Sequence, residues 1–309
     1  MKPPLFSIVI PVYLAEDRLR PLCDRLRAAL DPLSEDWEAI LVEDAGGDAS
    51  WRVIEELSRA DRRIRGVKLS RNFGQHAAIT AGLDRAGGEW IILMDCDLQD
   101  LPEEIPALYA KARDGWDVVT ARRRLRRDPW LRRQASRAFY RLFGYLTETR
   151  QDPATANFGI YARPAIKAVT SLRENLRYFP AMIQWVGFRS TMLDVEHAPP
   201  GNRRSSYSLR RLLRLAFDVM ISFSEKPLRL VVKLGFVIAG LSFAWALALA
   251  LRVLFFGRTV AGWTSLIVSI WFLSGLIIAI VGIVGIYVGR TFAEIKRRPI
   301  YIVERTTGD

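Results

Sequence analysis

The chain has 309 residues, of which 50% are hydrophobic and 25% are charged, so it is long enough for one substantial core and a smaller second unit. Its 45 Lys and Arg residues against 33 Asp and Glu give a formal net charge of +12, which indicates an anionic partner: nucleic acid, a membrane surface or a phosphorylated substrate. The two cysteines, Cys23 and Cys96, lie far apart and argue against both a disulfide scaffold and a zinc site.

Strand-like and helix-like segments alternate through the first 120 residues. The N-terminal apolar run is too short for a signal peptide, so we interpret it as a first strand and expect its domain to stay in the cytosol. Continuous apolar strands separated by helices predict a mainly parallel sheet covered on both faces. The predicted strands cover residues 6–13, 37–44, 64–70 and 89–95, and the predicted helices cover residues 16–30, 51–60 and 75–86.

The carboxyl ends of three predicted strands carry polar side chains. In open α/β sheets, ligands bind beyond the carboxyl ends of the strands, so this convergence predicts a functional site. The sequence contains neither the dinucleotide fingerprint G-x-G-x-x-G nor the phosphate-binding motif G-x-x-x-x-G-K-[ST]. The polar residues at the strand ends are Asp44, Arg71, Asn72, Asp95 and Asp97.

The stretch "MDCDLQD" places two aspartates, Asp95 and Asp97, directly after a buried strand. Hard divalent cations such as Mg²⁺ take one or two oxygen ligands from protein and the rest from phosphate and water. This pair therefore predicts a site for a metal-bound diphosphate. Helix capping is the alternative, and we assign it to Asp100, with Glu103 as a capping-box partner.

Two long charge-free segments in the last third predict membrane insertion. Residues 234–251 and 259–289 contain 18 and 31 residues without a charge, and each is long enough to cross a hydrocarbon core of about 30 Å. We expect a two-helix hairpin over residues 230–256 and 261–289, followed by a cytosolic tail at 290–309. Basic residues flank the outer ends of the hairpin, which by the positive-inside rule places both termini in the cytoplasm. A buried helical hairpin in a soluble protein is the alternative.

Two arginine-rich segments have an apolar stripe at helical spacing. Between Arg122 and Arg141 there are nine arginines and one acid, interleaved with aromatic and apolar residues, which predicts a basic interfacial helix over residues 122–146. The stretch "NRRSSYSLRRLLRL" has five more arginines, and we expect juxtamembrane amphipathic helices over 203–229. Nucleic acid is the rival partner, but the neighbouring hairpin favours anionic membrane lipids.

Several motifs together resemble the signatures of family 2 glycosyltransferases. These are "VIPVY", "VEDAGGDAS", "LSRNFGQHAAITAG" and "MDCDLQDLPEEI". The resemblance implies a GT-A fold, which is Rossmann-like, over residues 1–202 and a nucleotide-diphosphate sugar as donor. The segments "ANFGIYARPAI" and "RSSYSLRRLLRLAFDVMISFSEKPLRL", with the membrane helices, are similar to the polyprenyl-phosphate branch, which includes dolichol-phosphate mannose synthases and bacterial undecaprenyl-phosphate sugar transferases.

The resemblance also implies roles for individual residues. A divalent cation, Mg²⁺ or Mn²⁺, would bind Asp97 and Asp95, and Gln99 would reach the donor sugar. The residues expected around the nucleotide-sugar are Pro11, Tyr13, Glu16, Asp44, Arg71 and Asp95. The residues expected around the lipid phosphate are Arg122, Arg132, Ser136, Arg203 and Arg204.

One position departs from the family pattern. Many relatives carry an aspartate, often assigned as the base, where this chain has Asn157. Asparagine cannot accept a proton, but a phosphate monoester with a second pKa near 6 is mostly deprotonated at neutral pH and needs orientation more than activation. We therefore expect Asn157 to position the acceptor or the sugar, and a turn-stabilising role is the alternative.

The expected reaction is the inverting transfer of a hexose, from UDP rather than GDP, to undecaprenyl phosphate at the bacterial inner membrane. Relatives often form tetramers, so a homo-oligomer is expected by resemblance. A processive polysaccharide synthase is disfavoured, because two membrane helices cannot enclose a polymer channel and the Q-x-x-R-W motif is absent. A non-catalytic lipid-headgroup-binding protein with a degenerate transferase domain, or another lipid-linked glycan transferase, remains an alternative.

Overall fold

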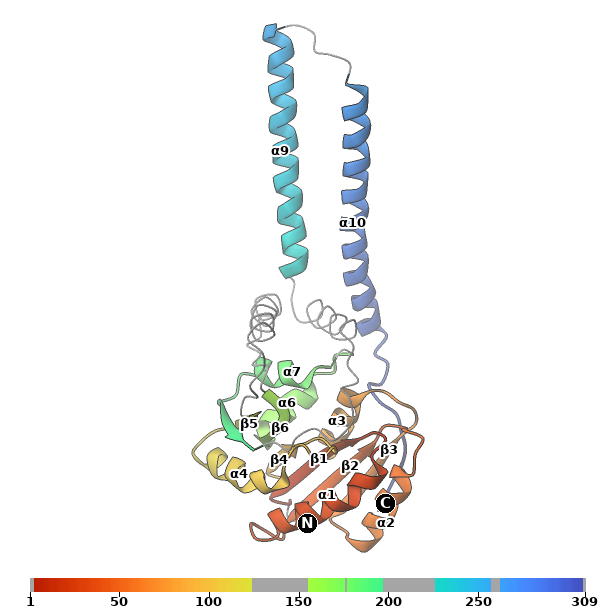
Figure 1. Cartoon of the computed structure of the whole chain (residues 1–309), viewed down its shortest axis with the longest axis vertical. Helices are drawn as coiled ribbons and strands as arrows, with labels where there is room; N and C mark the ends of the chain where they lie inside the picture. The colour runs from red at the N-terminus through yellow and green to blue at the C-terminus, as the bar shows by residue number, and fades with distance from the viewer. Residues whose placement is uncertain (1–2, 124–154, 176, 197–225, 257–261, 308–309) are drawn as a thin grey trace. The chain divides into compact units, whose positions relative to one another are not determined.

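The structure is a computed structural model that describes residues 3–123, 155–175, 177–196, 226–256 and 262–307 (Figure 1). The chain divides into two compact units. The first comprises Met1–Arg141, Thr149–Tyr207 and Arg298–Asp309, and the second comprises Leu142–Glu148 and Ser208–Arg297. The C-terminal residues beyond the last long helix therefore belong to the same unit as the N-terminal strands.

The first unit contains an eight-stranded mixed sheet in the order β7-β5-β6-β4-β1-β2-β3-β8. Strand β1 pairs in parallel with β2 and β4, and β2 pairs in parallel with β3. Strand β6 runs antiparallel to β4 and β5, while β8 runs antiparallel to β3. The strands are β1 (Phe6–Val12), β2 (Trp37–Glu43), β3 (Ile64–Leu69), β4 (Trp90–Leu93), β5 (Val118–Arg123), β6 (Thr155–Ala162), β7 (Ser190–Val195) and β8 (Val303–Thr306).

Helices cover both faces of this sheet, which confirms the predicted α/β architecture (Figure 1). Alternate residues of β2 point to opposite faces: Leu41 packs in a core with α1 and α2, and Val42 packs in a core with α3. Helix α3 packs so closely that a methyl group at Gly82 would lie 2.4 Å from Val9 Cγ1. The helices are α1 (Glu16–Leu30), α2 (Ser50–Ala60), α3 (Gln75–Leu83), α4 (Ile105–Arg113), α6 (Arg163–Ser171) and α7 (Phe179–Trp185), with a 3-10 turn η1 at Pro102–Glu104.

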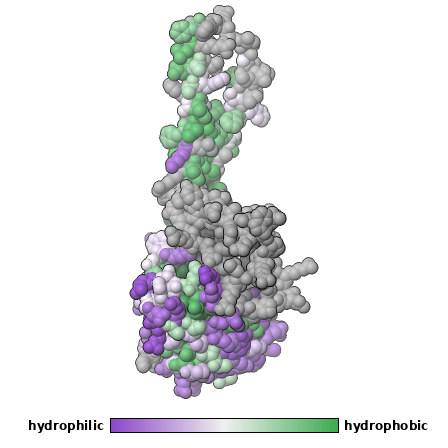
Figure 2. All heavy atoms as spheres, turned by 60° about the vertical axis from the view of Figure 1, so that its left-hand side comes forward, coloured by the Kyte–Doolittle hydropathy of each residue, from purple (hydrophilic) through white to green (hydrophobic). Residues whose placement is uncertain are grey.

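The second unit contains two long helices, α9 (Lys226–Phe256) and α10 (Trp263–Ile295). Their large apolar side chains lie on the outside; Phe236 is 77% exposed and Trp271 is 78% exposed. Figure 2 shows apolar side chains over these helices, whereas hydrophilic side chains cover much of the visible face of the first unit. Apolar surface of this extent is typical of helices that contact lipid or a partner.

The predicted two-helix transmembrane hairpin is not confirmed. Among the described residues, one segment, Ser269–Ile295, is long and apolar enough to cross a membrane, with a mean hydropathy of 2.4. The charge-free stretch within α9 has 18 residues, at the lower limit for crossing about 30 Å of hydrocarbon. The predicted interfacial helices at 122–146 and 203–229 lie almost entirely outside the described residues.

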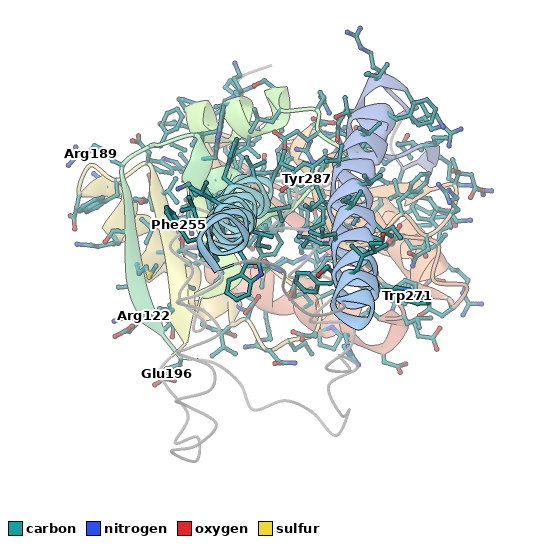
Figure 3. The ribbon with its side chains drawn as sticks, turned by 90° about the horizontal axis from the view of Figure 1, so that it is seen from above. Arg122, Arg189, Glu196, Phe255, Trp271 and Tyr287 are labelled. Carbon is teal, nitrogen blue, oxygen red and sulfur yellow. The ribbon has the colours of Figure 1, made fainter. Side chains whose placement is uncertain are left out.

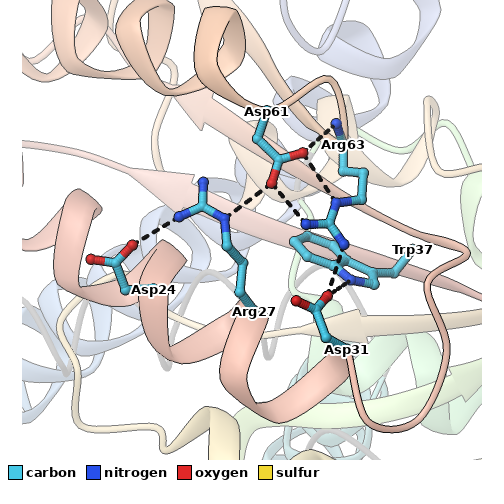
Figure 4. A network of polar contacts seen from close by, with 6 residues as sticks. All are labelled: Asp24, Arg27, Asp31, Trp37, Asp61 and Arg63. Carbon is cyan, nitrogen blue, oxygen red and sulfur yellow. Dashed lines mark hydrogen bonds and ion pairs between the residues drawn. The ribbon is translucent and has the colours of Figure 1, made fainter.

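A network of ion pairs ties α1 to the turn between α2 and β3 (Figure 4). Arg63 donates to both carboxylate oxygens of Asp61 at 3.0 and 3.1 Å, and Arg27 donates to the same carboxylate at 3.0 Å. Arg63 also lies over the Trp37 ring, 4.3 Å from its centroid. The hydrogen bonds from Arg63 and Arg27 lower the pKa of Asp61 from 3.8 to about 2.

The network predicts a pH-dependent contribution to stability. Because the pKa of Asp61 is lower in the folded state than in the unfolded state, its contribution is present above about pH 4 and is lost as the pH falls through 2. Asp61→Asn should lower the free energy of unfolding at pH 7 by about 2 kcal/mol. Thermal unfolding of the full-length protein in detergent, followed by tryptophan fluorescence, measures this difference.

Asp24→Asn provides the matched control, because Asp24 contacts Arg27 but its side chain is 72% exposed. It should change the unfolding midpoint little at any pH. Equal effects of the two substitutions at pH 7, or an Asp61→Asn effect that persists unchanged at pH 2, would contradict the account.

Candidate active site

The carboxyl ends of β1, β2 and β4 meet at one edge of the sheet, because the three strands are parallel neighbours. The loop after each strand contains one non-glycine residue in the left-handed region: Leu14 at φ 52°, Ala45 at φ 49° and Leu98 at φ 63°. Among the described residues, only Arg297 is a further non-glycine example. Such conformations cost free energy and cluster at functional sites, so this edge is the candidate active site.

The first two loops are locked together by side-chain hydrogen bonds. Glu16 at the start of α1 accepts from the Ala49 backbone N–H at 2.7 Å. The Ser50 hydroxyl accepts from the Ala15 backbone N–H at 3.1 Å and donates to Asp48 at 2.8 Å. The Glu16 carboxylate, expected near the nucleotide, therefore fixes the loop that follows β2.

Asp44, expected to contact the base of the nucleotide, is 3% exposed. Its two carboxylate oxygens accept from the backbone N–H groups of Phe73 and Gly74 at 2.7 and 2.8 Å. Burial raises the pKa of Asp44, and these two hydrogen bonds oppose that rise. Burial also raises the pKa of the adjacent Glu43, whose carboxylate accepts from Gly46 N–H at 2.6 Å. Asp44 thus holds the loop after β3 against the loop after β2.

Side-chain and backbone amides donate hydrogen bonds to both acids of the pair after β4. Gln75, the first residue of α3, donates through its side-chain amide to Asp95 at 2.8 Å. Gln99 donates to both oxygens of Asp97, through its backbone N–H at 3.0 Å and its side-chain amide at 2.7 Å. The sequence analysis did not predict a role for Gln75. Its position at the end of the loop that follows the third strand could have indicated one.

The capping prediction for the helix after this loop is wrong. The N-cap position of η1 is Leu101, and no side chain caps it. Asp100 is 2% exposed and accepts from the Asp95 backbone N–H at 3.2 Å, so it supports the acidic loop instead. Glu103 forms a two-point ion pair with Arg25 at 2.7 and 2.8 Å.

Asn157 lies on β6, the antiparallel neighbour of β4. The register pairs Leu93, the last residue of β4, with Gly159, so Asn157 lies two residues further along β6, beyond the end of β4 that Asp95 follows. Its backbone carbonyl accepts from the Tyr161 hydroxyl at 3.4 Å. The fold thus brings Asn157 to the same end of β4 as the acidic pair, although Asn157 and Asp95 are 62 positions apart in the sequence.

The acidic pair fits a hard divalent cation that also binds a diphosphate. Asp97 forms no ion pair with any Lys or Arg that the structure describes, so amide donors orient its carboxylate without neutralising the charge. Across the described ranges, no group of three or more His, Cys, Asp or Glu side chains forms a complete metal cage. Phosphate oxygens and water would have to supply the remaining ligands, as is usual for Mg²⁺.

The other expected nucleotide-binding residues flank the same edge. Pro11 is buried in β1, paired with Val42 of β2. Tyr13 follows β1 and is 51% exposed. Arg71 is exposed after β3, with its guanidinium 4.5 Å from the centroid of the Phe73 ring.

Among the expected lipid-phosphate residues, only Arg122 is described. It forms a two-point ion pair with Asp194 of β7 at 2.5 and 3.0 Å. Figure 3 shows Arg122 near Glu196, at the same end of the paired strands β5 and β7. The Arg122 guanidinium therefore already has an acidic partner. Arg132, Ser136, Arg203 and Arg204 lie outside the described residues.

Solved structures share the fold. Glucosyl-3-phosphoglycerate synthase from Mycobacterium tuberculosis, in complex with Mn²⁺, uridine diphosphate and phosphoglyceric acid, matches with a TM-score of 0.52 and 15% identity over 71% of this chain and 76% of that chain. Another structure of the same synthase gives a TM-score of 0.51 at 16% identity, over 71% of this chain and 78% of that chain. At this identity, the match establishes the GT-A-like fold.

Sequence relatives span nearly the whole chain. An uncharacterized glycosyltransferase of Synechocystis sp. is 37% identical over 98% of this chain and 95% of its own length. Two further relatives are named undecaprenyl-phosphate 4-deoxy-4-formamido-L-arabinose transferase. The protein from Aeromonas hydrophila is 34% identical over 97% of this chain and 93% of its own length. The protein from Pseudomonas fluorescens is 37% identical over 97% of this chain and 89% of its own length. The model of glycosyl transferase family 2 matches residues 7–167, which include both the acidic pair and Asn157. The chain is a transferase enzyme that belongs to glycosyl transferase family 2.

Proposed function

We propose that this chain is a membrane-bound enzyme that transfers a hexose from UDP to polyprenyl phosphate, with inversion at the anomeric carbon. The observation that carries the proposal is the acidic pair Asp95 and Asp97 at the carboxyl edge, with Asn157 on β6 beyond the same end of β4. Relatives named as undecaprenyl-phosphate sugar transferases, similar over nearly the whole chain, support the choice of acceptor. The structural relative bound to Mn²⁺ and uridine diphosphate supports the fold, and the choice of UDP and of a metal is part of the proposal.

The donor site is built around Asp97 and Asp95. A Mg²⁺ or Mn²⁺ ion held there would stabilise the negative charge that develops on the departing diphosphate. Gln99 orients Asp97 through two hydrogen bonds, and Gln75 orients Asp95. This arrangement keeps the carboxylates in place before the nucleotide arrives, so little reorganisation is needed when it binds.

The acceptor side needs no base from the protein. A phosphate monoester is mostly ionised at neutral pH, so one of its oxygens can attack the anomeric carbon directly. Asn157 contributes hydrogen bonds that orient the acceptor phosphate or the sugar hydroxyls. The bond between the anomeric carbon and the nucleotide phosphate breaks as the bond to the lipid phosphate forms, and the nucleoside diphosphate leaves.

The sheet constrains how the chain crosses the membrane. Strand β8 follows α10 in sequence and pairs with β3, so the segments before and after the long helices fold into one sheet on one side of the bilayer. The chain must then cross the bilayer an even number of times between β7 and β8. If α10 crosses, we propose that α9 is the second crossing and that the catalytic unit faces the cytosol of a bacterial inner membrane.

Substitution of Asp97 tests the donor site. Asp97→Asn keeps the shape but removes the charge that would bind the cation, so we expect transfer to fall by at least about 10²-fold. Membranes that contain the protein are incubated with radiolabelled UDP-hexoses, Mn²⁺ and undecaprenyl phosphate, and the label in the lipid phase is counted. Asp114→Asn, which changes an exposed acid that pairs with Lys111, is the matched control. Full activity of Asp97→Asn, or label that is independent of metal in the wild type, would refute the donor site.

The pH profile tests attack without a base. In the wild type, kcat/KM should rise between about pH 5 and 7 as the acceptor phosphate loses its second proton, and then level off. Asn157→Asp adds a carboxylate but should give no faster transfer at any pH, whereas Asn157→Ala should lower kcat because orientation is lost. A many-fold gain in rate for Asn157→Asp would mean that the reaction is limited by the missing base.

Cysteine labelling tests the even number of crossings. Gly262→Cys, between α9 and α10, should react in intact cells with a membrane-impermeant maleimide, because that connection would face the outside. Arg298→Cys, after α10, should react only after the cells are lysed. The native cysteines are buried and give little background. Labelling of both positions in intact cells, or of neither, would contradict the proposed topology.

A further inference from the structure

A cavity of about 630 Å³ lies in the first unit, between the end of α3, the start of β4, α6 and the segment before β8. Its walls include Leu83 and Ile91, which are buried, and Tyr301, which is half-buried. The volume falls within the range of small-molecule sites. Four cationic side chains and one carboxylate line this cavity: Arg85, Arg163, Lys167, Arg173 and Asp84.

The single carboxylate, that of Asp84, accepts hydrogen bonds on both of its oxygens from other residues that line the cavity. Arg173 donates to both oxygens of Asp84 at 2.8 and 3.0 Å, and the Tyr301 hydroxyl donates to Asp84 at 2.8 Å. These bonds neutralise Arg173 and fix the tyrosine. Three positive charges, on Arg85, Arg163 and Lys167, then remain without an acidic partner among the residues the structure describes.

Two of the three cations are preorganised. Arg163 donates one N–H to the Gly87 carbonyl at 2.7 Å, and Arg85 donates to the Ala81 carbonyl at 3.0 Å and to the Tyr301 hydroxyl at 3.2 Å. A guanidinium has five N–H donors, so each arginine keeps donors for a ligand while its position is fixed. Lys167 lines the cavity and is exposed, so its flexible side chain can reach a ligand that enters.

The cavity is separate from the candidate active site. Helix α3 begins at Gln75, which contacts Asp95, and reaches its C-cap at Asp84, nine residues and about 13 Å further along the helix. Strand β6 likewise has Asn157 towards one end and is followed at the other end by Arg163. The two sites therefore lie at opposite edges of the same elements.

We propose that this cavity, lined by Arg85, Arg163 and Lys167, is a second anion site that binds a phosphate group. Three uncompensated charges in a concave wall focus the electrostatic potential, and arginine forks match phosphate oxygens in geometry. The phosphate can belong to a soluble metabolite or to a lipid headgroup. Tyr301 follows the apolar helix α10 by only six residues in sequence, which makes a headgroup a source worth testing.

The test uses the full-length protein in nanodiscs of phosphatidylcholine, titrated with inorganic phosphate while the unfolding temperature is followed. Phosphate should stabilise the wild type, and Lys167→Glu should weaken the apparent affinity by about tenfold or more. Lys167 is exposed and its side chain forms no hydrogen bond with the residues that the structure describes, so this substitution should leave the unliganded protein as stable as the wild type. Asp97→Asn should retain the wild-type response, because the phosphate would bind outside the donor site.

Arg52→Ala is the matched control, since it removes a cation that is 76% exposed on α2, and it should respond as the wild type does. A second arm uses nanodiscs that contain phosphatidylglycerol. If the headgroup fills the cavity, these discs should stabilise the wild type, suppress its response to added phosphate, and fail to stabilise Lys167→Glu. Equal responses of Lys167→Glu and wild type in both arms, or no response of the wild type in either, would overturn the proposal.

Discussion

The parallel pairing of β1 with β2 and β4 is the constraint on which the site depends. Because these strands run in the same direction, the three loops that follow them begin at one edge of the sheet. Each of these loops brings a carboxylate to that edge. Amide N–H groups, from the backbone at Asp44 and from Gln99 at Asp97, orient the acids within the described structure. Amide donors leave the negative charge available, which is what a cation and its diphosphate require.

Many features of the sheet and its first helices can be predicted from the sequence, because their signals are local. Helix α1 has the predicted bounds, since its apolar positions repeat at helical spacing between two polar turns. The four predicted strands consist mostly of buried residues, and the structure contains all of them within two residues of the expected ends. The acidic pair was visible for the same reason, as charge placed directly after a buried strand.

What could not be predicted depends on contacts between distant segments. Glu103 has the spacing of a capping-box residue, but Arg25, 78 positions earlier in the sequence, forms an ion pair with it. Strand β8 is short and polar, so its own sequence does not predict a strand. It becomes one because it pairs with the edge of β3. The orientation of Arg122 towards Asp194 likewise depends on the pairing of β5 with β7, which neither segment encodes by itself. The roles of the arginines outside the described residues stay predictions.

The proposed function depends on a cation that bridges the acidic pair and a diphosphate. The most direct measurement is an experimental structure of the full-length protein with UDP and Mn²⁺, in which anomalous scattering locates the metal. We expect a manganese peak within about 2.3 Å of a carboxylate oxygen of Asp97, bridged to the diphosphate. UDP bound at this edge with no metal beside Asp97, or a peak elsewhere in the molecule, would contradict it.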